Sequence, residues 1–194
     1  MKHLKEEKTL VVLKPDAVQR ALVGEILSRF ERTGFKIVGM KMAYASKELA
    51  GEHYADDEEW LISVGEKTKQ SYAAKGIAND EEPKSIGQRI RQQLMDFISM
   101  SPTVAFVLEG NDVINKVRVM IGGTAPNSAL PGTIRGDFGF DSYGLADAAG
   151  RPIQNLIHAS DSVESAKREI AIWFKEDELH SYERVDEALN YRIA

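Results

Sequence analysis

The sequence predicts an α+β sandwich in which helices cover one face of a sheet, and three observations lead to this fold class. Apolar runs of strand length alternate with stretches whose apolar residues recur at helical spacing. One major helix is expected between the first and second strands, and another between the third and fourth. The 194 residues contain no internal repeat and no linker, so we expect a single domain over 1–194. A doubly wound parallel sheet is the competing arrangement.

The first quarter of the chain predicts two strands and two helices. Residues 8–13 (KTLVVL) are typical of a short buried strand, and apolar residues at helical spacing predict a helix over about 19–32. Alternating apolar positions over 35–44 predict the second strand. Ser46 is a suitable N-cap for a short helix that runs to about Tyr54.

The middle of the chain predicts an insertion, a helix and a third strand. The segment over about 56–85 is polar and irregular, and we interpret it as an insertion that is part helix and part loop. After Pro83 an apolar stripe marks an amphipathic helix, carried by Ile86, Ile90, Leu94, Phe97 and Ile98. Residues 103–110 (TVAFVLEG) then predict the third strand.

The last part of the chain predicts two helices and a final strand around a long segment of little periodicity. Residues 113–121 favour a helix, whereas 124–150 is rich in Gly, Pro, Ala and Asp, and long segments of this kind inside a domain are usually functional. Residues 152–158 predict the last strand. Asp161 and Glu164 are expected to begin the final helix. The polar tail over about 177–194 is expected to wrap around the domain or to pack on a neighbour.

Composition excludes several classes of function. The absence of cysteine excludes disulfides, thiolate metal sites and a cysteine nucleophile. The net charge of −5 argues against a broad nucleic-acid face, and no specific nucleic acid is expected as a partner. The N-terminal MKHLKEEKTL has no apolar signal core, and no run reaches the length of a membrane span. We therefore expect a cytoplasmic protein without a membrane partner.

Common nucleotide and metal motifs are missing. The fragment Gly65-Glu66-Lys67-Thr68 lacks the glycine that a P-loop needs before its lysine, and Glu66 would repel phosphate. No G-x-G-x-x-G follows a strand, and no two histidines have zinc-ligand spacing.

His158 is the strongest single candidate for chemistry. It follows an apolar run in NLIHASDS, where a lone histidine is more often structural than catalytic. Its neighbours shift that balance: Ser160 can donate to the backbone or to a glutamate, and Glu169 lies along the following helix. A carboxylate that accepts the proton of one imidazole nitrogen leaves the other nitrogen nucleophilic. His158 and Glu169 therefore have the chemistry of a nucleophile and its orienting partner.

Cations spread along the chain form a second candidate group. Lys14 ends the first strand, Arg118 lies on a helix, and Arg135 lies in PGTIRGDFG, where glycines allow close approach of a ligand. Each alone is more often a solvated surface charge. Together with the hydroxyl and amide of Thr124, they have the charge to hold a triphosphate during transfer, although spacing does not show that they converge.

Four segments of the sequence resemble nucleoside diphosphate kinases. TLVVLKPDAVQR, RVMIGGTAP, PGTIRGDF and NLIHASDSVESAKREIAIWF resemble motifs of that family in the same order. The resemblance implies a ferredoxin-like βαββαβ antiparallel sheet with helices on one face, plus insertions at about 56–85 and 139–152. It also implies transfer of the γ-phosphoryl group from a nucleoside triphosphate to a nucleoside diphosphate through a phosphohistidine (ping-pong), which maintains NTP and dNTP pools.

The resemblance also implies roles for individual residues and partners. His158 matches the residue that carries the phosphoryl group, Glu169 the residue that fixes its imidazole, and Tyr54 a tyrosine beside it. Asn155 matches the asparagine that reads the sugar hydroxyl. The phosphate-binding positions match Lys14, Arg118, Thr124 and Arg135. Mg²⁺ would arrive on the nucleotide's own phosphates, and the assembly would be a homo-oligomer, a hexamer or a tetramer.

The sequence departs from the common family form on the base side and in two segments. Where that form has a base-stacking phenylalanine, this chain has Ile90, with Leu94 as the other candidate, and both also suit the helix's own apolar stripe. The longer 139–152 segment is expected to change oligomer contacts or to cover the cleft. Two alternative functions remain at this point: a noncatalytic nucleotide sensor or protein-binding module, and a phosphohistidine hydrolase.

Overall fold

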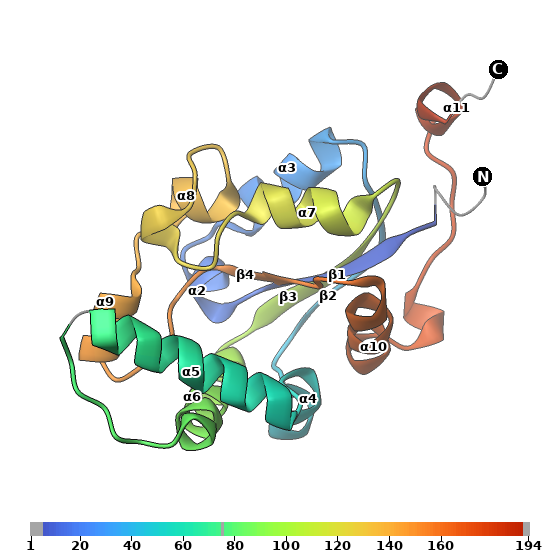
Figure 1. The fold of residues 1–194 in the computed structure, drawn as a ribbon. Helices are drawn as coiled ribbons and strands as arrows, with labels where there is room; N and C mark the ends of the chain where they lie inside the picture. Colours follow the sequence, from blue (N-terminus) through green and yellow to red (C-terminus); the bar gives the residue numbers. More distant parts are fainter. Residues whose placement is uncertain (1–5, 75, 192–194) are drawn as a thin grey trace. The chain divides into compact units, whose positions relative to one another are not determined.

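The computed structural model describes residues 6–74 and 76–191, which divide into two compact units (Figure 1). One unit consists of the chain up to Tyr44 and from Ser101 onward, and the other is Ala45–Met100. The chain leaves the first unit after its second strand and returns just before its third. The expectation of one domain over 1–194 stays a prediction.

The first unit is built on a four-stranded antiparallel sheet in the order β2-β3-β1-β4. With its two crossover helices, the chain order is βαββαβ, so the predicted ferredoxin-like α+β fold is confirmed. The doubly wound parallel alternative is wrong, because every neighbouring pair of strands is antiparallel. The strands are β1 (Lys8–Leu13), β2 (Lys36–Ala43), β3 (Thr103–Glu109) and β4 (Ile157–Ala159).

Helices α3 (Val23–Arg32) and α7 (Val113–Ile121) cover one face of this sheet, as predicted (Figure 1). In α7 the buried residues Val113, Val117 and Ile121 recur every four positions and join the main core. Helix α10 (Val163–Trp173) adds a layer on the opposite face (Figure 1). Both faces of β1 are consequently buried, which explains its uninterrupted apolar sequence.

Several boundaries differ from the sequence-based expectations for local reasons. The helix expected over 19–32 begins later, as α3 at Val23, and a separate short helix that was not expected, α2 (Pro15–Gln19), precedes it, because Ala21 between them has a left-handed φ of 56°. The last strand begins at Ile157 rather than 152, because Leu156 has a φ of 71° and breaks the extended backbone. Ser162, not Asp161, caps α10: its side chain accepts from the backbone N–H of Ser165.

The segment over 124–150 contains three short helical elements rather than an irregular loop. They are too short to repeat an apolar period, so periodicity did not reveal them. Gly122, with a φ of 83°, ends α7 ahead of this segment, and an added Cβ there would lie 2.4 Å from Thr133 Oγ1. The elements are η1 (Pro126–Ser128), α8 (Ile134–Phe138) and α9 (Tyr143–Ala148).

The described residues of the second unit, 45–74 and 76–100, form three helices. The insertion predicted over about 56–85 contains a 17-residue helix followed by an irregular connection, as expected. This 17-residue helix and the helix that follows it pack closely together. A Cβ atom added to Gly87 of the following helix would lie only 2.2 Å from the carbonyl oxygen of Leu61. The helices are α4 (Lys47–His53), α5 (Glu58–Ala74) and α6 (Pro83–Ser99).

The C-terminal segment wraps along the edge strand β2, which fits one of the two arrangements expected for the tail. The backbone N–H of His180 donates to the carbonyl of Val38 at 2.7 Å, and the Tyr182 hydroxyl donates to the carbonyl of Ile37 at 2.9 Å. This contact coincides with a β-bulge of β2 between Ile37 and Gly39. The segment contains η2 (Glu176–Glu178) and α11 (Glu187–Asn190).

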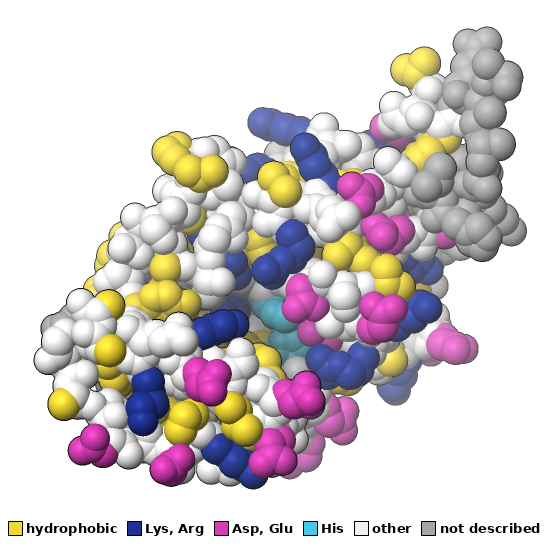
Figure 2. Space-filling view, in the orientation of Figure 1, with side chains coloured by type: hydrophobic (Ala, Val, Ile, Leu, Met, Phe, Trp, Pro, Cys, Tyr) yellow, Lys and Arg dark blue, Asp and Glu magenta, His cyan; other side chains and the backbone are white. Residues whose placement is uncertain are grey.

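Charges of both signs are interspersed over the face drawn in Figure 2, in agreement with the balance of 25 basic and 30 acidic residues. None of the helices in the part of the chain that the structure describes has both the length and the apolar character that crossing a membrane requires.

Candidate active site

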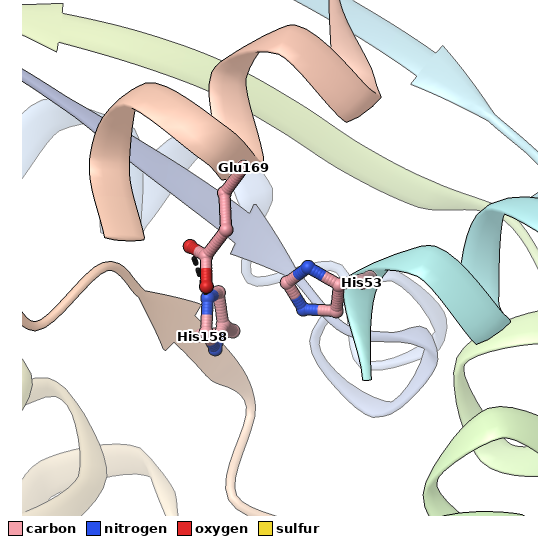
Figure 3. A group of neighbouring side chains, drawn as sticks. All are labelled: His53, His158 and Glu169. Carbon is pink, nitrogen blue, oxygen red and sulfur yellow. Dashed lines mark hydrogen bonds and ion pairs between the residues drawn. The ribbon is translucent and has the colours of Figure 1, made fainter. Parts of the chain in front are cut away.

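His158 lies on β4, opposite Val12 of β1, and its imidazole is tied to a carboxylate (Figure 3). Its Nε2 is 2.8 Å from Oε2 of Glu169, and the hydroxyl of Ser160 donates to the same Oε2 at 2.7 Å. The His158 side chain is 24% exposed and that of Glu169 is 6% exposed. The ring is therefore accessible while the group that orients it is buried.

Helix α10 delivers this carboxylate because of its helical spacing. Its buried residues Ala166, Glu169 and Trp173 are three and four positions apart, so Glu169 points from the face that packs toward β1. When Nε2–H donates to Glu169, Nδ1 carries the lone pair of the neutral imidazole. In this tautomer Nδ1 is the ring nitrogen with the lone pair that a nucleophile needs.

Lys14, Asn155 and Thr124 form a connected polar chain. Lys14 Nζ donates to Asn155 Oδ1 at 2.8 Å, and Asn155 Nδ2 donates to the carbonyl of Thr124 at 2.9 Å. Lys14 and Asn155 are 6% and 3% exposed, whereas Thr124 is exposed. The strand-end lysine is thereby fixed beside the segment that leads into β4.

The backbone at Leu156 is held in its left-handed conformation from both sides by the turn after β1. The N–H of Lys14 donates to the carbonyl of Leu156 at 2.8 Å, and the N–H of Leu156 donates to Oδ2 of Asp16 at 2.9 Å. The left-handed backbone conformation costs a leucine about 1–2 kcal/mol of conformational free energy. These two hydrogen bonds hold Leu156 in that conformation despite the cost.

Arg135 joins three segments through backbone carbonyls. Its Nε donates to Asn155 O at 3.2 Å, its Nη1 to Gly122 O at 3.0 Å and Gly123 O at 3.4 Å, and its Nη2 to Ile157 O at 2.6 Å. Arg135 is 5% exposed. The guanidinium thus connects α8, the end of α7 and the approach to β4.

Arg118 approaches the other end of β4 from the exposed side of α7. Its Nη1 is 3.4 Å from the carbonyl oxygen of Ala159, the residue after His158. The structure therefore brings Lys14, Arg118 and Arg135 together on the segment from Asn155 to Ala159, which sequence spacing alone did not establish.

Burial lowers the pKa of two of these cations. Burial, followed by the nearby charge of Arg135, lowers the pKa of Lys14 from 10.5 to about 8, while Asp16 opposes the change. Burial, followed by Arg118, lowers the pKa of Arg135 from 12.5 to about 10, opposed by Tyr143 and Asp16. At neutral pH both remain cationic, and Lys14 is the one that titrates closest to physiological pH.

Other sequence-predicted residues lie in the second unit. Tyr54 follows α4, and its carbonyl accepts a hydrogen bond of 2.5 Å from Nε of Arg91. Ile90 and Leu94 lie on α6 and are both half-buried, whereas Ile86 on the same helix is fully buried. Their roles beside the imidazole and the base stay predictions.

Two acidic residues near this site were not among the sequence candidates. Asp16 is 8% exposed beside Lys14, and an acid directly after Lys14-Pro15 at a strand end was the available signal. Asp141 is 1% exposed in the longer 139–152 segment, where it pairs with Arg151 and accepts from the N–H of Gln154 at 2.7 Å. No local pattern marked Asp141, because Arg151 and Gln154, which hold it in place, are 10 and 13 positions away.

A nucleophilic imidazole beside clustered cations is suited to phosphoryl transfer, because the cations neutralise charge on the transferring group. Fold and site together define the class as a phosphate-transfer protein that uses a histidine. The sequence profile described as "Nucleoside diphosphate kinase" matches residues 7–61 and 69–179.

Known proteins with high similarity carry the same description. A nucleoside diphosphate kinase of Pyrobaculum aerophilum is 48% identical over 178 residues, covering 89% of this chain and 97% of the relative. A crystal structure of an NDP kinase from the same organism has a TM-score of 0.88 at 46% identity and covers 91% of this chain and 100% of that chain. A Borrelia burgdorferi nucleoside-diphosphate kinase, described as a transition-state mimic with bound vanadate and ADP, has a TM-score of 0.78 at 38% identity, covering 97% and 99%. The chain belongs to the nucleoside diphosphate kinase family.

Proposed function

We propose that this chain transfers the γ-phosphoryl group of a nucleoside triphosphate to a nucleoside diphosphate through a phosphohistidine at Nδ1 of His158. The observation that carries the proposal is the 2.8 Å contact between His158 Nε2 and Glu169 Oε2, which supports a tautomer with the proton on Nε2 and the lone pair on Nδ1. Family membership supports the same reaction class.

The reaction is balanced in two half-steps. In the first, Nδ1 of His158 forms a bond to the γ-phosphorus while the bond from that phosphorus to the β,γ-bridging oxygen breaks, and the nucleoside diphosphate leaves. In the second, a terminal β-phosphate oxygen of another diphosphate attacks the same phosphorus and the N–P bond breaks. Glu169 holds the Nε2 proton throughout and stabilises positive charge on the phosphorylated ring.

The cations are proposed to bind phosphate oxygens, and Asn155 to bind the sugar. Lys14, Arg118 and Arg135 supply the charge, and Thr124 adds a hydroxyl and an amide. Asn155 Oδ1 accepts from Lys14 and retains a second lone pair for a sugar hydroxyl. Mg²⁺ would enter bound to the nucleotide phosphates, because these basic and amide groups suit phosphate oxygens and are poor ligands for a bare Mg²⁺.

The base side is proposed to be tolerant of different bases. Ile90 and Leu94 offer apolar surface without base-specific hydrogen bonds, which fits an enzyme that maintains several NTP and dNTP pools. If they contact the base, Ile90→Ala and Leu94→Ala should raise KM for every nucleotide by a similar factor. Unchanged KM values would assign both residues to the core of the second unit.

The proposed context is a cytoplasmic homo-oligomer, a hexamer or a tetramer. Light scattering of the purified chain measures its mass in solution directly. A monomer at micromolar concentration would contradict this part of the proposal and leave the chemistry of His158 standing.

The experiment that tests the central claim is intact-protein mass spectrometry after incubation with ATP and Mg²⁺. We expect a mass increase of one phosphoryl group that is acid-labile and alkali-stable, and that disappears on addition of a nucleoside diphosphate. His158→Ala should abolish it while nucleotide binding largely survives. His180→Ala is the matched control, because His180 is an exposed histidine in the tail and should retain the modification.

Other outcomes would identify the alternatives. Absence of the modification in the unmutated protein would favour a noncatalytic nucleotide-binding module. A modified protein that releases inorganic phosphate, and does not phosphorylate a diphosphate acceptor, would indicate a phosphohistidine hydrolase.

A further inference from the structure

Asp16 is a buried carboxylate surrounded by positive charge. Its side chain lies in the turn after β1 and accepts from the N–H of Leu156 through Oδ2 at 2.9 Å. Within the described residues, its other oxygen, Oδ1, is buried and has no hydrogen-bond partner. A buried carboxylate oxygen without a hydrogen bond requires nearby cations to remain ionised.

Cations from three parts of the first unit supply that charge. Lys14 precedes α2, Arg135 comes from α8, and Arg151 comes from the segment that leads to β4, and the pKa of each is affected by the charge of Asp16. Burial raises the pKa of the Asp16 carboxyl itself, and the charge of Lys14 is the largest effect that opposes this rise. Two of these cations, Lys14 and Arg135, are themselves candidates for phosphate binding. When no nucleotide is present, the negative charge of Asp16 therefore partly offsets the positive charge of the proposed phosphate-binding cations.

The same carboxylate also fixes the backbone next to the proposed sugar-binding residue. Leu156, with a φ of 71°, directly follows Asn155, and its N–H is held by Asp16 while its carbonyl accepts from the N–H of Lys14. Asp16 thus acts on Lys14 through charge and on Asn155 through backbone geometry.

We infer that Asp16 is a positioning residue of the phosphoryl-transfer site: its carboxylate stabilises the positive charge of Lys14 in the free enzyme and holds the left-handed turn at Leu156 that orients Asn155. The inference rests on the proposed function of His158 and assigns Asp16 a task within it. Once a nucleotide is bound, its phosphates take over the stabilisation of the charge on Lys14.

Asp16→Asn separates the two tasks. The amide oxygen can still accept the N–H of Leu156, so the turn is retained, whereas the negative charge is lost. We expect the alkaline limb of the pH profile of kcat/KM, which reports the free enzyme, to move to lower pH by about one unit. The alkaline limb of kcat should move much less, because bound phosphates then face Lys14.

Asp112→Asn is the matched control for loss of one negative charge. Asp112 is exposed at the start of α7, where its side chain accepts from Asn115, and its left-handed φ of 50° is compatible with asparagine. Its pH profile should coincide with that of the unmutated protein.

Lys14→Arg tests whether Lys14 is the titrating group. Arginine holds its proton to higher pH than lysine does at the same position, so the alkaline limb should move to higher pH, and adding Asp16→Asn should shift the limb over the original range much less than it does when Lys14 is present. Asp16→Ala removes the acceptor as well and should also raise KM, since the Leu156 turn is no longer held.

An Asp16→Asn profile identical to that of the Asp112→Asn control would overturn the inference. So would an Asp16→Asn protein that fails to fold, since its hydrogen bond to Leu156 is preserved. Either result, obtained with unmutated protein that still forms the phosphohistidine, leaves the proposed function intact. Failure of the unmutated protein to take up phosphate would instead reject the proposed function.

Discussion

Lys14 Nζ and Asn155 Oδ1 are 2.8 Å apart, so a hydrogen bond joins the end of β1 to the start of the β4 segment across 141 positions of sequence. The proposed phosphate-binding cation and the proposed sugar-binding amide therefore cannot move independently. Loss of either partner should affect recognition of both parts of the nucleotide.

Lys14→Met is expected to reduce kcat/KM by about 100-fold or more, because a phosphate-neutralising charge is lost. It should nevertheless raise thermal stability near neutral pH. The pKa of Lys14 falls from 10.5 to about 8 on folding, so burying its charge lowers the free energy of unfolding, and this loss is complete below about pH 8. Between about pH 8 and 10.5 the folded protein loses the proton before the unfolded chain does, so the loss becomes smaller as pH rises. The stability advantage of Lys14→Met should therefore shrink across that window.

Thermal melts across that pH range, with the exposed Lys167→Met as control, measure this effect. A Lys14→Met protein less stable than the unmutated one at every pH would show that the bond to Asn155 outweighs the cost of burying the charge.

Arg135→Lys is expected to lose almost as much stability and phosphoryl-transfer activity as Arg135→Ala. Lysine retains the charge but cannot span the carbonyls of Gly122, Asn155 and Ile157 that the guanidinium joins. Both variants should lose about 2–4 kcal/mol of unfolding free energy, because buried carbonyls are left unsatisfied. Transfer should fall by orders of magnitude, as measured by coupled assay beside urea unfolding.

Arg32→Ala, at the exposed end of α3, is the control for loss of an arginine. An Arg135→Ala enzyme with unchanged turnover would contradict a role for the α8 segment in phosphate transfer.

Ser160→Ala and Glu169→Gln should show coupled, non-additive effects on the first half-reaction. Oε2 of Glu169 is 2.8 Å from His158 Nε2 and accepts from Ser160 Oγ at 2.7 Å, so one oxygen serves both groups. We expect the rate of phosphohistidine formation to fall about 10–100-fold in Glu169→Gln and by a smaller factor in Ser160→Ala. The rate of the double mutant should be close to that of Glu169→Gln alone. Rapid-quench measurement of phosphohistidine formation gives the three rates, and strictly multiplicative losses would argue against a shared unit.

The ion pair between Asp141 and Arg151 should stabilise the 139–152 segment at neutral pH, and this stabilisation should be lost in acid, where Asp141 is protonated. Burial alone would raise the pKa of Asp141, but hydrogen bonds from Arg151 and from the N–H of Gln154 and Ser142 outweigh it and hold the pKa below 3.8. A carboxyl pKa lowered on folding contributes stability that is present above 3.8 and is lost as pH falls through the folded value.

Asp141→Asn should therefore lower the unfolding free energy by about 1–3 kcal/mol at neutral pH, and the difference from the unmutated protein should vanish in acid. Because Gln154 directly precedes Asn155, KM for the nucleotide should rise as well. Asp147→Asn, on the exposed side of α9, is the control, and a difference that persists at low pH would exclude this pair as its source.

The sequence predicted the elements with a clear apolar pattern. Helix α7 repeats a helical period, and strands β1 and β3 are uninterrupted apolar runs of strand length, whereas the βαββαβ order was implied by the resemblance to a known family. The break at Ala21 and the short helices α8 and α9 were not predictable in this way, since a left-handed residue or a helix of one turn leaves no period.

For the candidate site, the sequence indicated residue types and their order but not how they are connected. His158 and Glu169 are 11 positions apart, on a strand and the following helix, so local spacing indicated their pairing. The contacts of Arg135 with backbone carbonyls leave no trace in side-chain identity, and the burial of Asp16 depends on segments far away in the chain. Such features follow only from tertiary packing.

The C-terminal segment has one further consequence. β2 is an outer strand, and an outer strand presents peptide groups to which a strand of another molecule can add. Near the bulge, the carbonyls of Ile37 and Val38 are already occupied by Tyr182 and His180, so this stretch is unavailable as a template for aggregation. A chain shortened after Trp173 should keep its phosphate chemistry at first and then precipitate by intermolecular strand addition, which would make shelf life, rather than turnover, the property that the tail protects.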